Sequence, residues 1–222
     1  NDAITQANSA TGGTTTSFTI DGGITINGGT ASDFTTLLAN ETASQLAITD
    51  QNLTVDDGTI SVANARSLSA ATTGTVTGTI TSGTTIAAMV DGSSGLTETS
   101  NAYTITISSG DAEATAANLT SLYGKTSVAV DASAVTQITG TVAEANILYA
   151  AGASEITGLG NETVVLTETG LNDGSAEGTV ATLNTLDNNT TGTINAVIFL
   201  SSPILAKTIK RLAKPALDIH IF

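Results

Sequence analysis

The stretch TLNTLDNNTTGTINA at residues 182–196 is the third version of a pattern that the chain has already used at 65–78 and 119–132. In each version a Leu is followed by a Thr four residues later and by a β-branched residue eight residues later. The three sets are Leu68, Thr72 and Val76; Leu122, Thr126 and Val130; and Leu186, Thr190 and Ile194, with a fainter copy at Leu38, Thr42 and Leu46. Repeat proteins bury a continuous core by stacking similar units. We therefore predict that the motif marks where each repeat turns from helix into strand.

Helical and strand periods alternate around these motifs. Residues 111–123 have an apolar helical face, with Asp111 placed to cap the helix. Residues 128–140 predict a short strand, a turn and a second short strand. TVAE at 141–144 is a capping-box pattern that opens a short helix.

Further along, residues 154–169 return to strand and residues 175–187 to helix. The beginning of the chain is different. TTTSFTIDGGITINGG at 14–29 alternates apolar and polar residues between Gly-Gly turns. This alternation predicts that the part of the chain up to Ile60 is purely β.

Together these patterns predict a β-rich repeat solenoid, elongated, with mainly parallel strands stacked in coils and short helices at some corners. Its expected parts are a β-rich N-terminal part at 1–62, a degenerate repeat solenoid at 63–196 and a divergent tail at 197–222. The alternative is an array of β-sandwich domains. That alternative requires regular antiparallel hairpins, which the sequence after Gly110 does not mark.

Composition limits how the core is built and how it is held together. Aromatic residues make up 3% of the chain and Trp is absent, whereas Ala, Val, Ile, Leu and Thr are abundant. Small and β-branched side chains suit thin, strand-rich layers. The chain has no Cys, so it has neither a disulfide framework nor a thiolate metal site.

Charge is distributed unevenly along the chain. Residues 1–196 carry 19 acidic side chains and two basic ones, Arg66 and Lys125. Such a body repels nucleic acid and anionic lipid, so we expect no nucleic-acid partner. The chain begins with Asn, and no charged and apolar leader segment follows. We expect it to be a fragment from inside a longer protein.

Three segments carry a resemblance to a known group of proteins: LNTLDNNTTGTINA at 183–196, ITGLGNETVVLTET at 156–169 and TVAEANILYAA at 141–151. They resemble the long Ala/Thr/Gly-rich repeat regions of very large bacterial cell-surface proteins of the marine cyanobacterial type. The resemblance covers residues 63–196 and departs at SLYGKTSVAV, where Thr126-Ser127 replaces the usual TTG. It implies an extracellular, secreted structural role and supplies no catalytic residues.

The residue inventory argues against catalysis. The carboxylates are scattered, Arg66 and Lys125 are the only cations of the body, and the single His, His220, lies in the tail. A serine-type triad therefore lacks its base in the body. We expect no enzyme and name no catalytic or cofactor-binding residue.

Calcium is the most serious ligand candidate. DQNLTVDDGT at 50–59 concentrates hard oxygen donors at Asp50, Asn52, Asp56 and Asp57. The segment matches neither an EF-hand nor the Gly-rich nonapeptide repeat, and an Asx-rich turn between strands explains it equally. Calcium stays a possible cofactor, with no metal ligand assigned.

The positions of Thr and Tyr bear on two other binding roles, ice binding and polysaccharide binding. Thr-x-Thr triplets begin at Thr75, Thr79, Thr104 and Thr191, and ice binding requires such triplets in register on one flat face. The intervals between them are too unequal to look like a repeat period. Polysaccharide binding requires aromatic platforms. The only tyrosines are Tyr103, Tyr123 and Tyr149, and the last two occupy corresponding places on short helices, which indicates packing.

The tail at 197–222 differs from the rest of the chain, with both prolines, the only His and four of the six basic residues. Residues 204–216 fit a basic amphipathic helix for a membrane surface or a partner. The abrupt change equally fits a junction with non-native sequence, or a cap on the last repeat.

The sequence thus predicts a non-catalytic structural segment of a large secreted cell-surface protein that serves as scaffold, stalk or adhesive layer. Expected partners are neighbouring repeats of the same long chain and cell-surface polysaccharide, with membrane contact only through the tail. A polysaccharide-binding or polysaccharide-cleaving β-solenoid is the second hypothesis, and an ice-binding solenoid the third.

Overall fold

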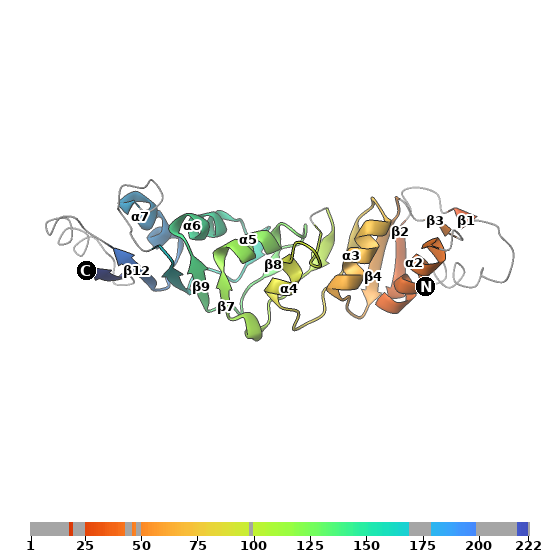
Figure 1. The fold of residues 1–222 in the computed structure, drawn as a ribbon, viewed down its shortest axis with the longest axis horizontal. Coiled ribbons are helices and arrows are strands. Elements are labelled where there is room, and N and C mark those ends of the chain that lie inside the picture. The colour runs from red at the N-terminus through yellow and green to blue at the C-terminus, as the bar shows by residue number, and fades with distance from the viewer. Residues whose placement is uncertain are drawn as a thin grey trace. The chain divides into compact units, whose positions relative to one another are not determined.

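The computed structural model describes residues 18–19, 25–42, 46–47, 50–97, 100–168, 179–198 and 217–221. The chain divides into two compact units. Unit 1 comprises Asn1–Thr106 and Leu122–Val130, and unit 2 comprises Ile107–Ser121 and Asp131–Phe222. Each unit contains one larger parallel sheet with helices in its connections (Figure 1).

Unit 1 is built on a four-stranded parallel sheet with the strands in chain order. The strands are β2 (Thr25–Thr30), β4 (Asn52–Asp57), β5 (Val76–Thr79) and β6 (Ala102–Thr104). The connecting helices are α2 (Ala31–Thr42), α3 (Val62–Ala71) and α4 (Ile86–Val90). Two shorter strands, β1 (Phe18–Thr19) and β3 (Leu46–Ala47), form a separate parallel pair. Parallel neighbouring strands require a crossover connection, and α2, α3 and α4 lie in the crossovers of the larger sheet.

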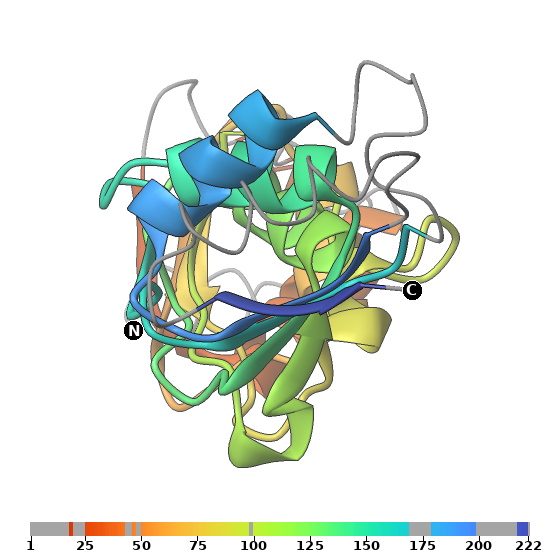
Figure 2. The same ribbon diagram turned by 90° about the vertical axis from the view of Figure 1, so that its left-hand side faces the viewer.

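Unit 2 contains a five-stranded parallel sheet, again with the strands in chain order. They are β7 (Glu113–Thr115), β9 (Gln137–Gly140), β11 (Thr163–Leu166), β12 (Ile194–Ile198) and β13 (Leu217–Ile221). Helices α6 (Val142–Ala150) and α7 (Val180–Asn189) lie side by side on one face of this sheet (Figure 2). Shorter elements are the 3-10 turn η1 (Ser109–Asp111), helix α5 (Ala116–Tyr123) and the paired strands β8 (Val130–Asp131) and β10 (Ile156–Thr157). The last two residues of α5 and the first residue of β8 belong to unit 1.

Strand register shows where one strand-plus-helix unit ends and the next begins. Leu53 of β4 pairs with Val76 of β5, and α3 is the connection between these two strands. Val164 of β11 pairs with Ile194 of β12, and α7 lies in the connection between them. Leu68 lies in α3, Leu122 in α5 and Leu186 in α7. One further helix, α4 or α6, lies between each of these and the next. Each spacing between the Leu motifs therefore covers two βα units.

The cores are aliphatic and thin. In unit 2 the strand residues Val164 and Ile194 are fully buried against Leu186 of α7 and Val142 and Ala145 of α6. In unit 1 the same relation holds between buried residues of β4 and β5 and buried residues of α2 and α3, namely Leu53, Val76, Phe34, Leu37 and Leu68. Burial of apolar area at about 25 cal/mol per Å² makes these contacts the main source of stability.

The predicted fold class was wrong. The chain is an α/β fold with parallel sheets and not a β-rich solenoid with helices at some corners. The helices connect parallel strands as crossovers. Apolar residues spaced three and four apart give such helices one apolar face that is buried against a sheet. The sandwich alternative fails too, since the strand pairings within both larger sheets are parallel.

The prediction that the chain is purely β up to Ile60 was also wrong, because α2 lies within that part. The start of α2 carries a reciprocal cap: the Asp33 amide donates to Thr30 Oγ1 (3.2 Å) and the Thr30 amide donates to Asp33 Oδ2 (2.8 Å). Phe34 and Leu37, three positions apart, then bury one helical face. This T-x-x-D pattern is a readable helix-start signal that the strand alternation before it obscured.

Other local predictions are largely confirmed. The strand, turn and strand expected at 128–140 are β8 and β9, and the strands expected at 154–169 are β10 and β11. The helix expected at 111–123 begins only at Ala116, where Thr115 and not Asp111 accepts the cap bond from the Asn118 amide (3.1 Å). The helix expected at 175–187 is α7, which begins at Val180.

The capping box at 141–144 is confirmed and gives a first prediction. Thr141 Oγ1 accepts from the Glu144 amide (3.1 Å), and Glu144 Oε2 accepts from the Thr141 amide (2.8 Å). We expect Thr141→Ala to lower the free energy of unfolding by about 1 kcal/mol, because one helix N–H loses its acceptor. Urea denaturation of this variant beside Thr141→Ser, which keeps the hydroxyl, measures the effect. Equal stability of the two variants would contradict it.

The tail is described only at its two ends. β13 pairs in parallel with β12, from Leu217 opposite Ile194 to Ile221 opposite Ile198. The amphipathic helix predicted for 204–216 lies outside the described residues. The boundaries proposed at Val62 and Ala196 remain predictions.

Candidate functional site

The Leu-Thr-Val/Ile motif forms the same helix-to-strand connection at each copy. Leu68, Leu122 and Leu186 are buried near the ends of α3, α5 and α7. The β-branched residue opens the following strand in each case, at Val76 in β5, Val130 in β8 and Ile194 in β12, and all three are fully buried. The prediction that the motif marks the turn from helix into strand is confirmed.

The Thr of the motif joins two segments of backbone. Thr72 Oγ1 donates to the Gln51 carbonyl (2.6 Å) and accepts from the Gly74 amide (2.9 Å). Thr190 repeats this with the Gly160 carbonyl (3.3 Å) and the Gly192 amide (3.0 Å). One hydroxyl thus satisfies a carbonyl of the preceding βα unit and an amide of its own turn.

The middle copy makes the same pair of bonds with a different sequence. Thr126 Oγ1 donates to the Tyr103 carbonyl (2.7 Å) and accepts from the Val128 amide (3.1 Å). The departure from TTG in this copy therefore changes the residue two positions after the Thr, from Gly to Val, and leaves the role of the hydroxyl intact.

Removing one of these hydroxyls has a measurable expected cost. We expect Thr72→Val to lower the free energy of unfolding by about 1–3 kcal/mol, because Thr72 is buried and the substitution leaves an amide and a carbonyl without their partner. Ser82→Ala, at an exposed position, is the control. A Thr72→Val midpoint in urea equal to that of the control would show that the hydroxyl contributes nothing.

Glycine in the TTG copies permits close contact between segments. A Cβ added at Gly74 would lie 2.3 Å from the Gln51 carbonyl oxygen, and one at Gly192 would lie 1.8 Å from the Glu162 carbonyl oxygen. Neither distance is compatible with a side chain. These two glycines are therefore fixed by packing between consecutive βα units and not by a ligand.

Unit 2 also contains a buried acidic network. Glu162 is 1% exposed, its Oε2 accepts from the Tyr149 hydroxyl (3.0 Å), and both carboxylate oxygens accept from the Gly160 amide (2.9 and 3.1 Å). Burial raises the pKa of the Tyr149 hydroxyl above its ordinary value, with the neighbouring Glu162 charge adding to the rise. The ITGLGNE segment is thus a hydrogen-bonded turn tied to the end of α6.

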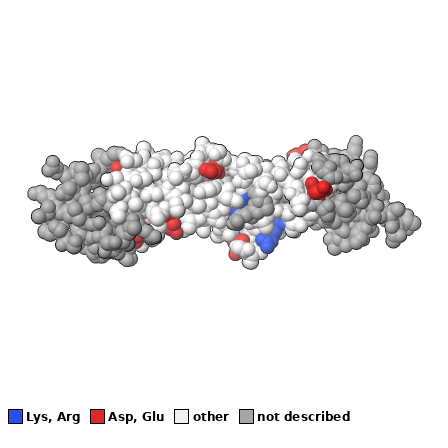
Figure 3. All heavy atoms as spheres, turned by 90° about the horizontal axis from the view of Figure 1, so that it is seen from above, with Lys and Arg blue, Asp and Glu red and all other residues white. Residues whose placement is uncertain are grey.

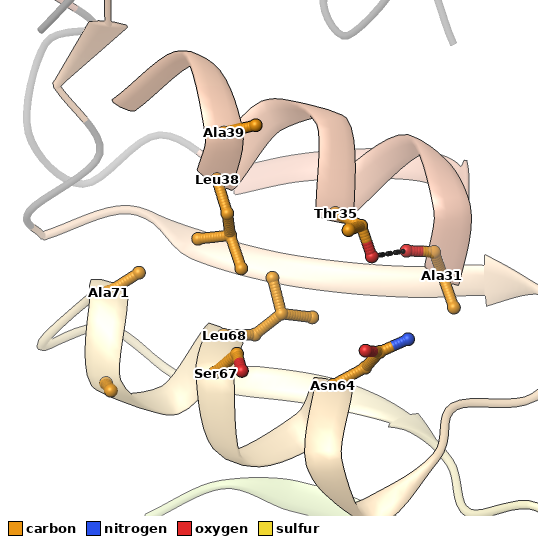
Figure 4. Close-up of a pocket in the computed structure, with 9 residues that line it drawn as sticks. Ala31, Thr35, Leu38, Ala39, Asn64, Ser67, Leu68 and Ala71 are labelled. Atoms are coloured by element: carbon orange, nitrogen blue, oxygen red, sulfur yellow. Dashed lines mark hydrogen bonds between the residues drawn. The ribbon is translucent and has the colours of Figure 1, made fainter. Parts of the chain in front are cut away.

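A shallow groove of about 520 Å³ lies between α2 and α3 in unit 1 (Figure 4). Leu38 and Leu68 point toward one another across it, and most of its other lining residues are small: Ala31, Thr35, Ala39, Asn64, Ser67, Ala70 and Ala71. The Thr35 and Ser67 hydroxyls donate to carbonyls of their own helices at 2.9 and 3.0 Å. The residues that line the groove include no charged side chain.

The calcium candidates at 50–59 do not come together as a ligand cluster. Asp50 Oδ1 accepts from the Gln51 side-chain amide (2.5 Å), and Asn52 Oδ1 accepts from the Thr75 amide (2.8 Å). Asp56 and Asp57 are exposed at the end of β4. Within the part of the chain that the structure describes, no three His, Cys, Asp or Glu residues are grouped to hold a metal ion. The acidic side chains visible in Figure 3 stand apart from one another.

The Thr triplets gave one wrong expectation. The interval from Thr79 to Thr104 is a strand register, because these two residues pair across β5 and β6. Both are exposed, and Thr59 Oγ1 lies 3.2 Å from Thr81 Oγ1 on the neighbouring segment. The two Thr-Ile-Thr triplets at 79–81 and 104–106 therefore begin at residues that are paired across neighbouring strands.

Tyr149 is partly buried against the core of unit 2, which confirms the packing predicted for it. Tyr123 is half-buried and follows the buried Leu122 near the end of α5. Tyr103 is fully buried, its hydroxyl donates to the Ala65 carbonyl (3.2 Å), and burial raises its pKa to about 12. Neither Tyr103 nor Tyr149 forms an open aromatic platform of the kind that stacks on sugar rings.

The two body cations occupy structural positions. Arg66 Nη1 donates to the Gly95 carbonyl (3.1 Å), and Lys125 is 8% exposed. His220 lies in β13 opposite Val197.

An exposed Asp gives a prediction on acid stability. Asp91 Oδ1 accepts from the hydroxyls and amides of Ser93 and Ser94 at 2.7–2.9 Å, and these bonds, led by the Ser93 hydroxyl, hold the pKa of Asp91 well below its ordinary value of 3.8. A carboxyl group whose pKa is lower in the folded state stabilises the fold when the pH is above the pKa of the unfolded state. This stabilisation is lost as the pH falls through the pKa of the folded state. We expect Asp91→Asn to be less stable than the original chain at pH 7, with the gap narrowing below pH 3.8. Urea midpoints across this range measure it, and a constant gap would contradict the assignment.

The chain was compared with protein families, curated proteins and solved structures. No family model matches the chain, and neither a curated protein nor a solved structure matches it. Among the described residues, no helix has the length and apolar character needed to cross a membrane.

Proposed function

We propose that the chain is a non-catalytic structural segment of a large secreted cell-surface protein, serving as scaffold, stalk or adhesive layer. The observation that supports this role best is the repeated helix-to-strand connection. Its recurring Leu and Thr, and the Gly of the TTG copies, are used to join consecutive βα units. The residues that recur along this chain thus serve its architecture.

The charge pattern supports the same role. The chain has a formal net charge of −14, and the carboxylates visible among the described residues are dispersed over the surface. Dispersed like charge keeps a protein soluble and separated from other acidic surfaces without creating a binding site. The proposed partners are neighbouring repeats of the same long chain, with cell-surface polysaccharide as the proposed adhesion target.

Two measurements test this proposal. Antibodies raised against the chain should label intact cells of the source organism, and the purified chain should release no sugar or other product from a panel of polysaccharides. Labelling that requires permeabilised cells would contradict the surface location. Release of reducing sugar would contradict the non-catalytic role and favour the polysaccharide-cleaving alternative.

Ice binding is the second candidate, and the register of the triplets at 79–81 and 104–106 favours it. Adjacent parallel strands lie about 4.8 Å apart, so the exposed, paired residues Thr79 and Thr104 are neighbours on one face of the sheet. If this face binds ice, Thr79→Lys should abolish any thermal hysteresis of the chain. An original chain with no thermal hysteresis would eliminate this candidate.

A further inference from the structure

Two Asp-Gly pairs lie within the described residues, Asp57-Gly58 at the end of β4 and Asp91-Gly92 after α4. All four residues are exposed, and no atom would lie within 4 Å of a Cβ added at either glycine. Glycine has no side chain that could shield its own amide nitrogen. In both pairs this nitrogen is therefore sterically open to reaction with the carboxyl group of the preceding Asp.

The two carboxyl groups differ in what holds them. Asp91 Oδ1 accepts from the amides and hydroxyls of Ser93 and Ser94 at 2.7–2.9 Å. Within the described part of the chain, no hydrogen bond or ion pair holds the Asp57 carboxylate. The four bonds keep the Asp91 side chain in one position and favour its ionised form, whereas Asp57 has neither restraint.

The backbone at Asp57 is also placed where pairing is irregular. β4 ends at Asp57, which pairs with Thr30 of β2 directly after a shift in register between Gly29 and Thr30. Gly58 follows in the left-handed region, with a φ of 87°. Ends of elements open more readily than their centres. The rotation that brings the Gly58 nitrogen to the Asp57 side chain therefore requires only local opening.

We propose that Asp57-Gly58 is a site of spontaneous isoaspartate formation, and that the Ser93–Ser94 turn protects Asp91-Gly92 from the same reaction. The Gly58 nitrogen attacks Cγ of the neutral Asp57 carboxyl group. A C–N bond forms while the nitrogen proton and the carboxyl hydroxyl leave as water, which gives a five-membered succinimide. Water then breaks the bond from the nitrogen to one of the two ring carbonyl carbons.

The direction of ring opening decides the product. Opening at the main-chain carbonyl of Asp57 leaves the peptide linked through Cγ, as isoaspartate, and opening at Cγ restores Asp. The water lost in the first step is regained in the second, so the mass is unchanged and no oxidant or cofactor is required. Isoaspartate adds one carbon to the main chain just before Ile60, which is fully buried and whose amide donates to the Thr79 carbonyl (2.8 Å).

Incubation of the folded chain tests the proposal at about pH 5, where part of an ordinary Asp population is still neutral. Electron-transfer fragmentation of the peptides distinguishes isoaspartate from Asp in each pair. The serine bonds lower the pKa of Asp91. The neutral fraction falls about tenfold for each unit by which a pKa is lowered, so we expect at least about tenfold more isoaspartate at 57–58 than at 91–92. Equal or lower content at 57–58 would overturn the proposal.

Two controls separate the fold from the local sequence. In guanidinium chloride the serine bonds are lost, so both pairs should form isoaspartate at similar rates. In the folded chain, the double variant Ser93→Ala, Ser94→Ala should raise the content at 91–92 several-fold. An undiminished difference between the pairs in the unfolded chain, or an unchanged content at 91–92 in the double variant, would overturn the protective role of the turn.

Variants at Asp57 test the reacting group itself. Asp57→Asn forms the same succinimide with loss of ammonia instead of water, so it should gain isoaspartate faster than the original chain. Asp57→Glu requires a six-membered ring and should remain unmodified at this position. A stable Asp57→Asn variant would show that the Gly58 nitrogen does not reach the side chain, and would overturn the proposal. These results are independent of the proposed scaffold role, which antibody labelling and the polysaccharide panel test separately.

Discussion

Replacing Leu186 with alanine is expected to lower the free energy of unfolding of unit 2 by about 2–5 kcal/mol. The side chain is fully buried and packs with Val164, Ile194 and Val142 in a core that has no large aromatic residue at its centre. Small neighbours on rigid strands have little freedom to fill the space that the substitution leaves. Urea denaturation followed by far-ultraviolet circular dichroism measures the loss.

The matched control is Ile147→Ala in α6. Ile147 is 56% exposed, so its truncation should change the free energy of unfolding by less than about 0.5 kcal/mol. Leu68→Ala in unit 1 should behave like Leu186→Ala, because it occupies the same position of the motif and is 1% exposed. A loss at Leu186 no larger than that at Ile147 would show that the motif Leu is not a core residue.

Replacing Gly74 with alanine is expected to destabilise unit 1 by about 3 kcal/mol or more, because overpacked side chains force the backbone to move. The new Cβ would lie 2.3 Å from the carbonyl oxygen of Gln51 and 2.9 Å from the Asn52 nitrogen. Both neighbours are backbone atoms at the start of β4, so they cannot rotate away. Separating them breaks the pairing of β4 with β5 at Leu53 and Val76.

Gly92→Ala is the control for this second substitution, since no atom lies within 4 Å of a Cβ added there. We expect it to leave the melting temperature within a degree or two of the original or to raise it slightly, as the unfolded chain loses freedom. Equal melting temperatures for Gly74→Ala and Gly92→Ala would contradict the close contact between consecutive βα units.

Local structure was easier to predict from the sequence than architecture. The motif Leu186, Thr190 and Ile194 was readable because burial, hydrogen bonding and strand entry each demand one kind of residue at a fixed spacing. The capping box at Thr141 was readable for the same reason. Such signals act over a few residues, so tertiary context does not override them.

The fold class was misjudged because pairing between distant segments decides it. Thr30 and Asp33 signal the start of α2, but the strand alternation before them favoured an all-β interpretation. The register of Thr79 with Thr104 was equally hidden, because the interval between them becomes a period only once β5 and β6 are known to pair. Pairing between strands is a long-range property that no single segment encodes.

The candidate site was harder to predict than the fold. The roles of Glu162 and Tyr149 depend on contact between α6 and a turn that follows it, which no spacing rule indicates. The calcium segment at 50–59 had the right donors but not the right geometry, since Asn52 is already used by the Thr75 amide. A sequence shows which residues carry oxygen donors, but it does not show whether those donors lie close enough together to bind one ion.

This chain consists of βα units added in parallel, with one recurring helix-to-strand connection after α3, α5 and α7. Nuclear Overhauser contacts between neighbouring strands in solution test this architecture most directly. We predict parallel-sheet contacts from Val164 to Ile194 and from Leu53 to Val76, together with a slowly exchanging Gly74 amide bound to the Thr72 hydroxyl. Antiparallel contacts between these strands, or rapid exchange at Gly74, would contradict it.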